Sequence, residues 1–392
     1  PMADVVLIAT ADWDHPLWTN KQHVACSLVS EGHRVLYVES LGLRTAQPSG
    51  RDLRRIFRRL RSGLRLPRQV CRNLWVWSPL VLPGGSSGCA RLLNQFSLGL
   101  GLELAFLITG FRRPWLWTYN PLTARLLNLS RYSMGIYHCV DAVQEQPCMP
   151  RVLITAEEQR LCGLVDQVFV TSPQLQRQLA PYARSIRYDP NVADQDHFAE
   201  AMQCADEDLP ADLAALALPR VGFIGAVSSY KLDFALIVAV AKALPQVQFV
   251  FVGPVGEGEP QTDISSLAHQ PNVHLLGHRD YGDLPRYCAG ISCGWLPLQL
   301  NPYTQAMFPM KFFEYLAAGL PVIASRIDAL QAFADVAWLC EPTAPAFTAA
   351  ISGCLAGKGP TLQQRLALVA EHTYTARTRR MLAALPMASP QV

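Results

Sequence analysis

The chain has 392 residues, half of them hydrophobic, with 34 lysines and arginines, 31 acids and a net charge of +3. This length predicts about two domains rather than one core, and the apolar content is sufficient to fill both. The eleven cysteines include no C-x-x-C pair. This excludes a regular disulfide framework and favours a reduced, cytoplasmic setting.

No signal peptide or membrane span is predicted from the sequence. A span needs about 20 apolar residues. The apolar stretch Leu98–Thr109 is shorter than that and contains Glu103. The chain is therefore expected to stay on the cytoplasmic side of a membrane.

The first half of the chain alternates predicted strands and helices. A strand at Val5–Ala9, a polar loop, a helix at about Lys21–Glu31 and a strand at Arg34–Glu39 make one β-α-β unit. Four later segments have the same strand-like pattern: Leu74–Trp77, Pro114–Thr118, Met134–Cys139 and Val168–Thr171. These elements predict a doubly wound N-terminal domain.

A second α/β series follows a polar stretch at 199–219. Strands are predicted at 220–224, 247–252, 273–275, 291–295 and 321–324, and helices at 233–244, 283–288 and 311–318. A final helix is predicted from Leu362 to Leu385.

The segment Phe308–Ser325 is the most informative one. It contains a short helix, a stop at Gly319 and Pro321, and a buried strand, with Lys311 and Glu314 near the start of the helix. Helix starts attract phosphate. A nearby lysine and carboxylate suit a nucleoside diphosphate, with the lysine on the phosphates and the carboxylate on the ribose hydroxyls.

Four further segments accompany this one in a fixed order: Val221–Ala226, Phe249–Pro254, Asn272–Gly277 and Tyr281–Pro285. Together, residues 220–330 resemble the donor domain of GT-B glycosyltransferases of the retaining family 4 type (glycosyltransferase group 1). The resemblance implies an α/β GT-B fold, two Rossmann-like doubly wound domains facing a central cleft. Residues 1–200 would form the acceptor domain and 201–365 the donor domain, with a helix in 366–392 packing back on the first.

The resemblance also implies a set of donor-binding residues: Gly225, Ser228, Lys231, Gly253, Lys311 and Glu314. Two positions depart from the family pattern, because Ala226 stands where relatives carry an arginine and Ala306 where they carry a second glutamate. Lys311 is expected to replace the arginine as phosphate clamp. Other readings stay open: Lys231 as a solvated helix-start lysine, Lys311 as a structural partner of Glu314, and Gly253 as a simple turn.

On the acceptor side, the strand Gly135–Asp141 resembles the one that carries a sugar-facing histidine, so His138 and Asp141 are expected at the donor sugar. A buried histidine with a structural role is the alternative. Asp14 and His15, after the first strand, are predicted acceptor contacts or a base. Asp12 and Asp14 form a D-x-D, but the resemblance implies a metal-independent enzyme with no cofactor, the nucleotide sugar being a substrate.

Residues 51–72 carry a concentrated positive charge. Nine arginines and one acid, Asp52, give this stretch +8, so the rest of the chain carries −5. Apolar residues recur at helical spacing between them: Leu53, Ile56, Phe57, Leu60 and Leu64. This pattern predicts an in-plane membrane contact through Arg51–Arg72, with a helix packed on the domain as the alternative. No nucleic-acid reader motif accompanies it.

The predicted function is a cytoplasmic glycosyltransferase, peripheral on the inner face of a membrane. It would move a sugar from a UDP-, GDP- or dTDP-type donor to a sugar, lipid-linked or small-molecule hydroxyl acceptor. The pathway would be polysaccharide, glycolipid or natural-product synthesis. The alternatives are a nucleotide-sugar 2-epimerase and a non-catalytic nucleotide-sugar-binding partner of an enzyme complex.

Overall fold

The computed structural model describes residues 2–15, 17–41, 66–81 and 88–386. Of the predicted basic stretch Arg51–Arg72, residues 51–65 lie outside them, and the described remainder includes a strand at Arg68–Cys71 where the sequence predicted no strand. The chain divides into two compact units, Pro1–Asp189 with Thr378–Val392, and Pro190–Arg377. The first boundary thus falls at Asp189, where the sequence placed it at residue 200, and the C-terminal residues that join the first unit begin at Thr378.

The first unit is built on an eight-stranded sheet with the order β3-β4-β2-β1-β5-β6-β7-β8. Its neighbouring strands are parallel except for the β3–β4 pair, which is antiparallel. The strands are β1 Asp4–Ile8, β2 Arg34–Val38, β3 Arg68–Cys71, β4 Leu74–Trp77, β5 Trp115–Thr118, β6 Met134–Cys139, β7 Gln167–Val170 and β8 Ile186–Tyr188. The strands predicted from sequence are confirmed to within one or two residues.

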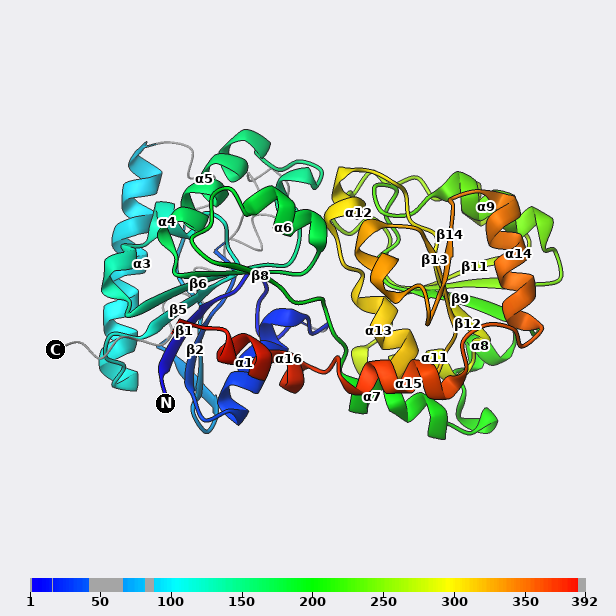
Figure 1. The fold of residues 1–392 in the computed structure, drawn as a ribbon, viewed down its shortest axis with the longest axis horizontal. Helices are drawn as coiled ribbons and strands as arrows, with labels where there is room; N and C mark the ends of the chain where they lie inside the picture. Colours follow the sequence, from blue (N-terminus) through cyan, green and yellow to red (C-terminus); the bar gives the residue numbers. More distant parts are fainter. Residues whose placement is uncertain (1, 16, 42–65, 82–87, 387–392) are drawn as a thin grey trace. The chain divides into compact units, whose positions relative to one another are not determined.

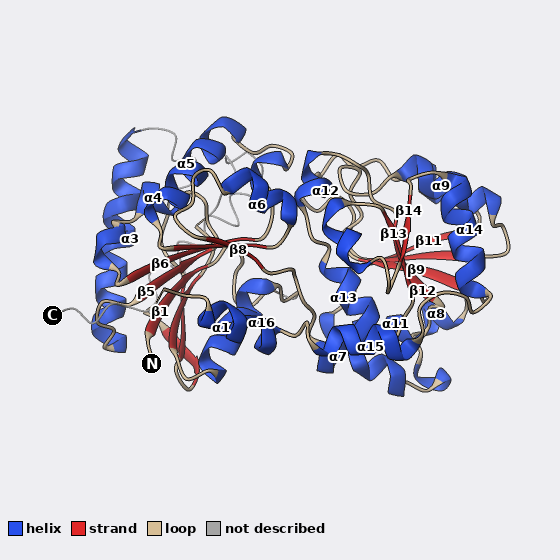
Figure 2. Ribbon diagram, in the orientation of Figure 1, coloured by secondary structure: helices blue, strands red, loops and turns tan. Residues whose placement is uncertain are grey.

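Helices cover both faces of this sheet (Figure 2). They are α1 Asn20–Ser30, α3 Gly88–Thr109, α4 Thr123–Leu126, α5 Arg151–Leu164 and α6 Pro173–Leu179. No helix was predicted here: the apolar stretch Leu98–Thr109, which was judged too short to span a membrane, is the second half of this longer helix (Figure 1).

Alternate residues of the central strands build the core beneath α3. Val6 and Ile8 of β1 lie in one buried cluster with Leu98 and Leu102 of α3. Trp77 of β4 joins the same cluster. A Cβ atom at Gly101 would lie 2.3 Å from the Trp77 ring, so this glycine lets the helix approach the sheet closely. The inner side of α3 is therefore fixed to the sheet.

The second unit is built on a six-stranded parallel sheet with the order β11-β10-β9-β12-β13-β14. The strands are β9 Arg220–Ile224, β10 Gln248–Val252, β11 Val273–Gly277, β12 Cys293–Leu296, β13 Val322–Ser325 and β14 Trp338–Cys340. Five of these were predicted from sequence, and all five are confirmed.

The helices of the second unit are short. They are α7 Gln195–Ala199, α8 Ala211–Ala214, α9 Phe234–Ala243, α10 Ser265–Ala268, α11 Leu284–Ala289, α12 Pro302–Ala306, α13 Met310–Ala317, α14 Ala344–Leu355 and α15 Leu362–Ala370. The single C-terminal helix predicted for Leu362–Leu385 is wrong. The first helix, α15, ends at Ala370, and a separate helix, α16, begins at Tyr374 and ends at Ala383. The Thr373 hydroxyl accepts a hydrogen bond from the Ala376 amide, so Thr373 starts the new helix.

A buried carboxyl group holds α5 against β6 in the first unit. The Tyr137 hydroxyl donates a 2.6 Å hydrogen bond to Glu158 Oε1, and the Cys139 thiol lies 3.4 Å from the same oxygen. Burial raises the pKa of Glu158, and the two hydrogen bonds only partly oppose that shift. The folded chain therefore holds a proton on this carboxyl more tightly than the unfolded chain does.

This shift predicts how stability depends on pH. The contribution of Glu158 is full below the unfolded pKa and is lost as pH rises through the higher folded pKa. Glu158→Gln keeps an acceptor for Tyr137 but does not titrate. We expect its free energy of unfolding to rise relative to that of the wild type as pH rises from about 4 to 8. The gain should be on the order of 1 kcal/mol per unit of pKa shift. Thermal unfolding midpoints across this range check it, and a constant difference between the two proteins would contradict it.

Candidate functional site

The second sheet reverses its strand order beside β9. Chain order runs outward from β9 through β10 and β11 on one side, and through β12, β13 and β14 on the other. In open α/β sheets, ligands bind outside the carboxyl ends of the strands at such a point. The loops that follow β9, β10 and β12 are therefore the candidate site of this unit.

The loop after β9 is tied to the loop after β12 by hydrogen bonds. Gln299 Nε2 donates to the Ser229 carbonyl at 2.8 Å, and the Gln299 amide donates to the Lys231 carbonyl at 2.9 Å. Asn301 Nδ2 donates to the Tyr230 carbonyl at 2.7 Å. These bonds fix the backbone of residues 229–231 at the carboxyl edge of the sheet.

Two glycines bring the loops after β9 and β10 into backbone contact. A Cβ atom on Gly253 would lie 1.9 Å from the Gly225 carbonyl oxygen, and Gly253 has a φ of +154°. The Val227 amide donates to the Pro254 carbonyl at 2.9 Å and extends the contact. Gly253 is required here because no side chain fits between the two loops.

Helix α13 brings Lys311 to the same edge. The Tyr315 hydroxyl accepts a 2.8 Å hydrogen bond from the backbone amide of Ile224, the last residue of β9. A Cβ atom at Gly294 would lie 2.4 Å from the Tyr315 ring, so a glycine on β12 makes room for this tyrosine. With the helix fixed in this way, Lys311 Cε lies 3.7 Å from the Cβ position of Gly225.

Lys311 and Glu314 form a close ion pair. Lys311 Nζ lies 2.6 Å from Glu314 Oε2, and the side chains are 26% and 4% exposed. Burial raises the pKa of the Tyr281 phenol, and the charge of Glu314 adds to that shift, so the carboxylate has an aromatic neighbour. The structure therefore shows the i, i+3 partnership. It leaves the lysine as the more accessible member of the pair.

Lys231 and Ser228 lie on the loop after β9. Lys231 Nζ lies 5.3 Å from the centre of the Tyr230 ring and 5.8 Å from that of Tyr303. The buried Ser228 hydroxyl donates to the Glu257 carbonyl at 2.8 Å, so it supports the loop from within. Ligand contacts by either residue stay predictions.

In the first unit, His138 is enclosed by aromatic rings. It has no exposed surface, and its ring centre lies 4.8 Å from that of Tyr119 and 6.0 Å from that of Trp117. This burial favours the structural role that the sequence left open, and a contact of His138 with the donor sugar stays a prediction. The structure places His138 in the core beneath the carboxyl edge of β6.

A lysine that the sequence did not single out lies above this cluster. Lys21, in the first turn of α1, has its ammonium 5.6 Å from the centre of the Tyr119 ring. Burial lowers the pKa of Lys21, and the negative charge of Asp141 opposes that shift. Lys21 and the predicted Asp141 thus meet at the carboxyl ends of β1, β5 and β6. No motif marks Lys21, and its only sequence signal is a cation at the start of the first helix.

Asp14 and His15 lie in the loop after β1, as predicted, and both are exposed. Asp14 Oδ2 accepts from Arg68 at 2.6 Å, and His15 Nδ1 lies 2.9 Å from the Leu17 carbonyl. Across the described ranges, no three His, Cys, Asp or Glu side chains cluster as a metal site would require.

Comparison with known proteins assigns a family to the second unit. Residues 218–357 match the family model "Glycosyl transferases group 1". The chain is 28% identical over 225 residues to TuaH of Bacillus subtilis (strain 168), a protein provisionally named as a teichuronic acid biosynthesis glycosyltransferase. The match covers 54% of this chain, which spans about half, 55%, of that relative.

Solved structures of similar fold cover nearly the whole chain. Sucrose-phosphate synthase from Thermosynechococcus elongatus has a TM-score of 0.70 at 18% identity, covering 97% of this chain and 98% of its own. The HepE protein of Anabaena, solved with UDP and glucose, has a TM-score of 0.63 at 16% identity, covering 98% and 100%. An Escherichia coli trehalose-6-phosphate protein bound to UDP-2-fluoro glucose has a TM-score of 0.66 at 11% identity, covering all of both chains.

These findings define the class of protein. The fold is GT-B, as predicted, and residues 218–357 match the glycosyl transferases of group 1. The predicted resemblance to glycosyltransferases of that group is therefore confirmed over these residues. The retaining outcome and the independence from metal stay predictions.

The contact between Gly225 and Gly253 generates a prediction. Gly253→Ala would press a methyl group into a backbone carbonyl, so it should lower the free energy of unfolding by about 1–3 kcal/mol. Urea or thermal unfolding measures this. Gly282→Ala is the matched control, because a Cβ atom there meets nothing within 4 Å. Equal stability of the two variants would show that the loops are not in contact.

Proposed function

We propose that this protein transfers a sugar from a nucleoside diphosphate sugar to a hydroxyl acceptor, with the donor bound at the carboxyl edge of the second sheet. The observation that supports this best is the convergence of Lys311 and Glu314 on the Gly225 loop, inside the domain that matches the glycosyltransferase family. Solved proteins of this fold hold UDP with glucose or a UDP-sugar analogue, which supports a donor of that class.

In this proposal, different residues bind different parts of the donor. The backbone of the Gly225 loop and the Lys311 ammonium hold the diphosphate, and Lys231 adds a second cation. Glu314 accepts hydrogen bonds from the ribose hydroxyls. Stabilising negative charge as the leaving diphosphate forms is the largest catalytic contribution expected here. A retaining transfer needs no separate base, because the leaving phosphate takes the acceptor proton.

The acceptor side belongs to the first unit. Asp141 and Lys21 are charged groups of this unit that interact electrostatically, and Asp14 and His15 are exposed on the loop after β1. The similarity to a protein named for teichuronic acid biosynthesis supports a role in polysaccharide synthesis. We extend the proposal to a cytoplasmic protein that attaches to the inner face of a membrane through Arg51–Arg72.

A second candidate function is a nucleotide-sugar-binding partner without activity of its own. Two alanines favour it. Ala226 stands in the donor loop where relatives carry an arginine. Ala306 is buried in α12 where they carry a glutamate. Donor binding without turnover, whichever acceptor is offered, would identify this case.

Donor binding is tested first by thermal shift with UDP, GDP and dTDP. Binding to the folded state at 100 times the dissociation constant should add about 2.7 kcal/mol to stability. Lys311→Met and Glu314→Gln should each abolish most of that response. The first removes the phosphate cation, and the second replaces one carboxylate acceptor oxygen with a donor and removes the negative charge that strengthens the hydrogen bonds to the ribose hydroxyls. A full response in both variants would refute the proposed contacts.

Matched controls come from exposed charges of the same unit. Lys358→Met and Glu207→Gln make the same chemical changes on the surface. They should keep the wild-type nucleotide response, so any loss in the site variants is specific to Lys311 and Glu314.

Lys21 allows donor binding and chemistry to be separated. Lys21→Met should lower nucleoside diphosphate release from the donor sugar by about 100-fold, the usual effect of losing one positioned polar group. It should leave the nucleotide thermal shift unchanged, because Lys21 belongs to the other unit. Lys21→Arg should restore part of the rate, and Arg184→Met, at an exposed cation, should have no effect. An unchanged rate in Lys21→Met would exclude it from the reaction.

A further inference from the structure

Helix α3 has two apolar sides. Its inner side is buried against the first sheet and includes Leu98, Leu102 and Ala105. Its outer side exposes seven large apolar residues to solvent: Leu92, Leu93, Phe96, Leu100, Leu104, Leu107 and Ile108. At 3.6 residues per turn these seven fall within about 160° of the helix circumference. We call this set the outer apolar face.

The outer apolar face is too large to be an ordinary feature of a soluble surface. Phe96 is 71% exposed and Leu107 79% exposed, and the face follows a helix about 33 Å long. Contiguous apolar patches of this size mark interaction sites. A partner that binds this face must present apolar groups over the whole length of the helix.

The helix does not cross a membrane in this fold. By length and composition, Cys89–Thr109 would suffice for a span. However, Trp77 lies against Gly101, and Leu98 and Leu102 fill the core of the first unit. Removing α3 from the sheet would open that core. The helix therefore offers only its outer apolar face, as helices that lie in the plane of a membrane interface do.

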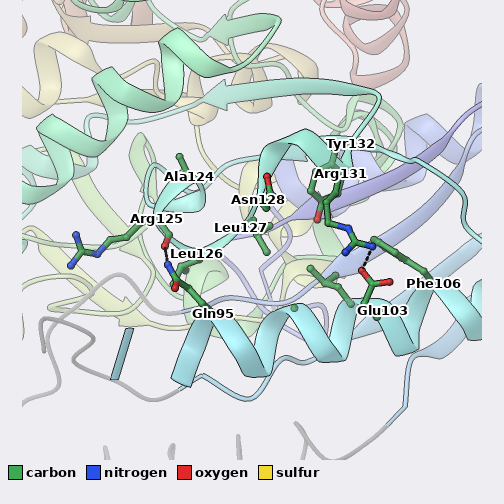
Figure 3. A pocket seen from close by; sticks show the side chains of 12 residues that line it. Gln95, Glu103, Phe106, Ala124, Arg125, Leu126, Leu127, Asn128, Arg131 and Tyr132 are labelled. Atoms are coloured by element: carbon green, nitrogen blue, oxygen red, sulfur yellow. Dashed lines mark hydrogen bonds and ion pairs between the residues drawn. The ribbon is translucent and has the colours of Figure 1, made fainter. Parts of the chain in front are cut away.

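Positive charge lies beyond one end of the face and along one side of it. The exposed Arg112 and Arg113 follow the end of α3. Along one side runs a groove of about 460 Å³ between α3 and residues 124–132 (Figure 3). There Arg131 lies 2.5 Å from Glu103, the one acid on the helix, and neutralises it. Cations bordering an apolar face suit the anionic headgroups of a lipid surface.

This charge distribution argues against a second copy of the chain as the cover. A second copy would present the same helix, whose one acid is already paired with Arg131, so that helix offers no free carboxylate to Arg112 and Arg113. Arginines left without a counter-charge at an interface cost binding energy. An anionic bilayer supplies both missing components, apolar chains for the face and negative charge for its border.

We propose that the outer apolar face of α3 inserts into the interfacial region of an anionic phospholipid membrane. This inference rests on the proposed membrane location of the protein and adds a second, hydrophobic contact to the electrostatic one through Arg51–Arg72. Arg112 and Arg113 after the end of α3 and Arg131 at the groove lie at headgroup level, and the leucines and Phe96 enter the acyl boundary.

The test is flotation of the full-length protein with vesicles of phosphatidylcholine containing phosphatidylglycerol, at low salt and at about 1 M salt. At about 1 M salt the Debye length is about 3 Å, so attachment by charge alone is lost. We expect the wild type to keep binding there. Leu100→Glu with Leu107→Glu should weaken binding at least about tenfold, because each large aliphatic side chain withheld from lipid accounts for about that factor.

The matched control is Val152→Glu with Leu164→Glu. These residues lie on α5 of the same unit, and they expose 84% and 43% of their surface, against 79% for Leu107 and 52% for Leu100. The control has the same change of charge and should bind vesicles as the wild type does. Both double variants should keep the wild-type thermal midpoint and nucleotide response, so a failed donor site is distinguished from a failed membrane face.

Three results would overturn the inference. Loss of all wild-type binding at high salt would leave only an electrostatic contact. A lower thermal midpoint in the α3 variant than in the α5 control would show that another part of the chain covers the face. Wild-type dimers that the α3 variant converts to monomers, with no vesicle binding by either, would assign the face to a second copy.

Discussion

The candidate donor site depends on a contact between two stretches of backbone at the carboxyl edge of the second sheet. The loops after β9 and β10 approach so closely that only glycine fits at residue 253, and the Gly225 carbonyl occupies the space a side chain would need. This contact lays the loop after β9 flat against the edge. A diphosphate bound there would meet main-chain amides as well as the lysine side chains, and the amides lose no rotamer freedom on binding.

Tyr315 extends this order to the side chains. Its hydroxyl accepts from the last amide of β9, so the strand that ends in the Gly225 loop also fixes α13. The Lys311–Glu314 pair follows from that placement. A carboxylate that is 4% exposed is costly without a partner, and the lysine 2.6 Å away supplies one. A nucleotide would offer phosphate to the lysine and hydroxyl donors to the glutamate, so each partner could exchange the other for a ligand without either charge being left unpaired.

Much of this arrangement can be predicted from the sequence because it depends on residues that are close together in the chain. Strands such as Met134–Cys139 and 220–224 are short apolar runs between turn signals, and Lys311, Glu314 and Tyr315 lie within one helix of eight residues. Packing between residues that are far apart in the chain cannot be predicted in this way. Lys21 and Asp141 are far apart in the chain, and only the parallel order β1-β5-β6 brings them to one edge. His138 matched a family pattern, but its burial depends on rings from β5 and β7 that the pattern does not include.

Helix α3 was not predicted, for a related reason. Periodicity indicates a helix when one side is apolar and the other polar. In α3 apolar residues occupy both sides, and Gly99 and Gly101 interrupt the helical propensity of its middle. The same pattern, with apolar residues on both sides, leaves one side of the helix packed on the sheet and the other exposed to solvent. Because Trp77 and Gly101 hold the inner side, the outer apolar face cannot turn inward to hide from water. The outer apolar face is therefore a rigid surface of the first unit. A partner that shields it from water must bind it without any rearrangement of α3.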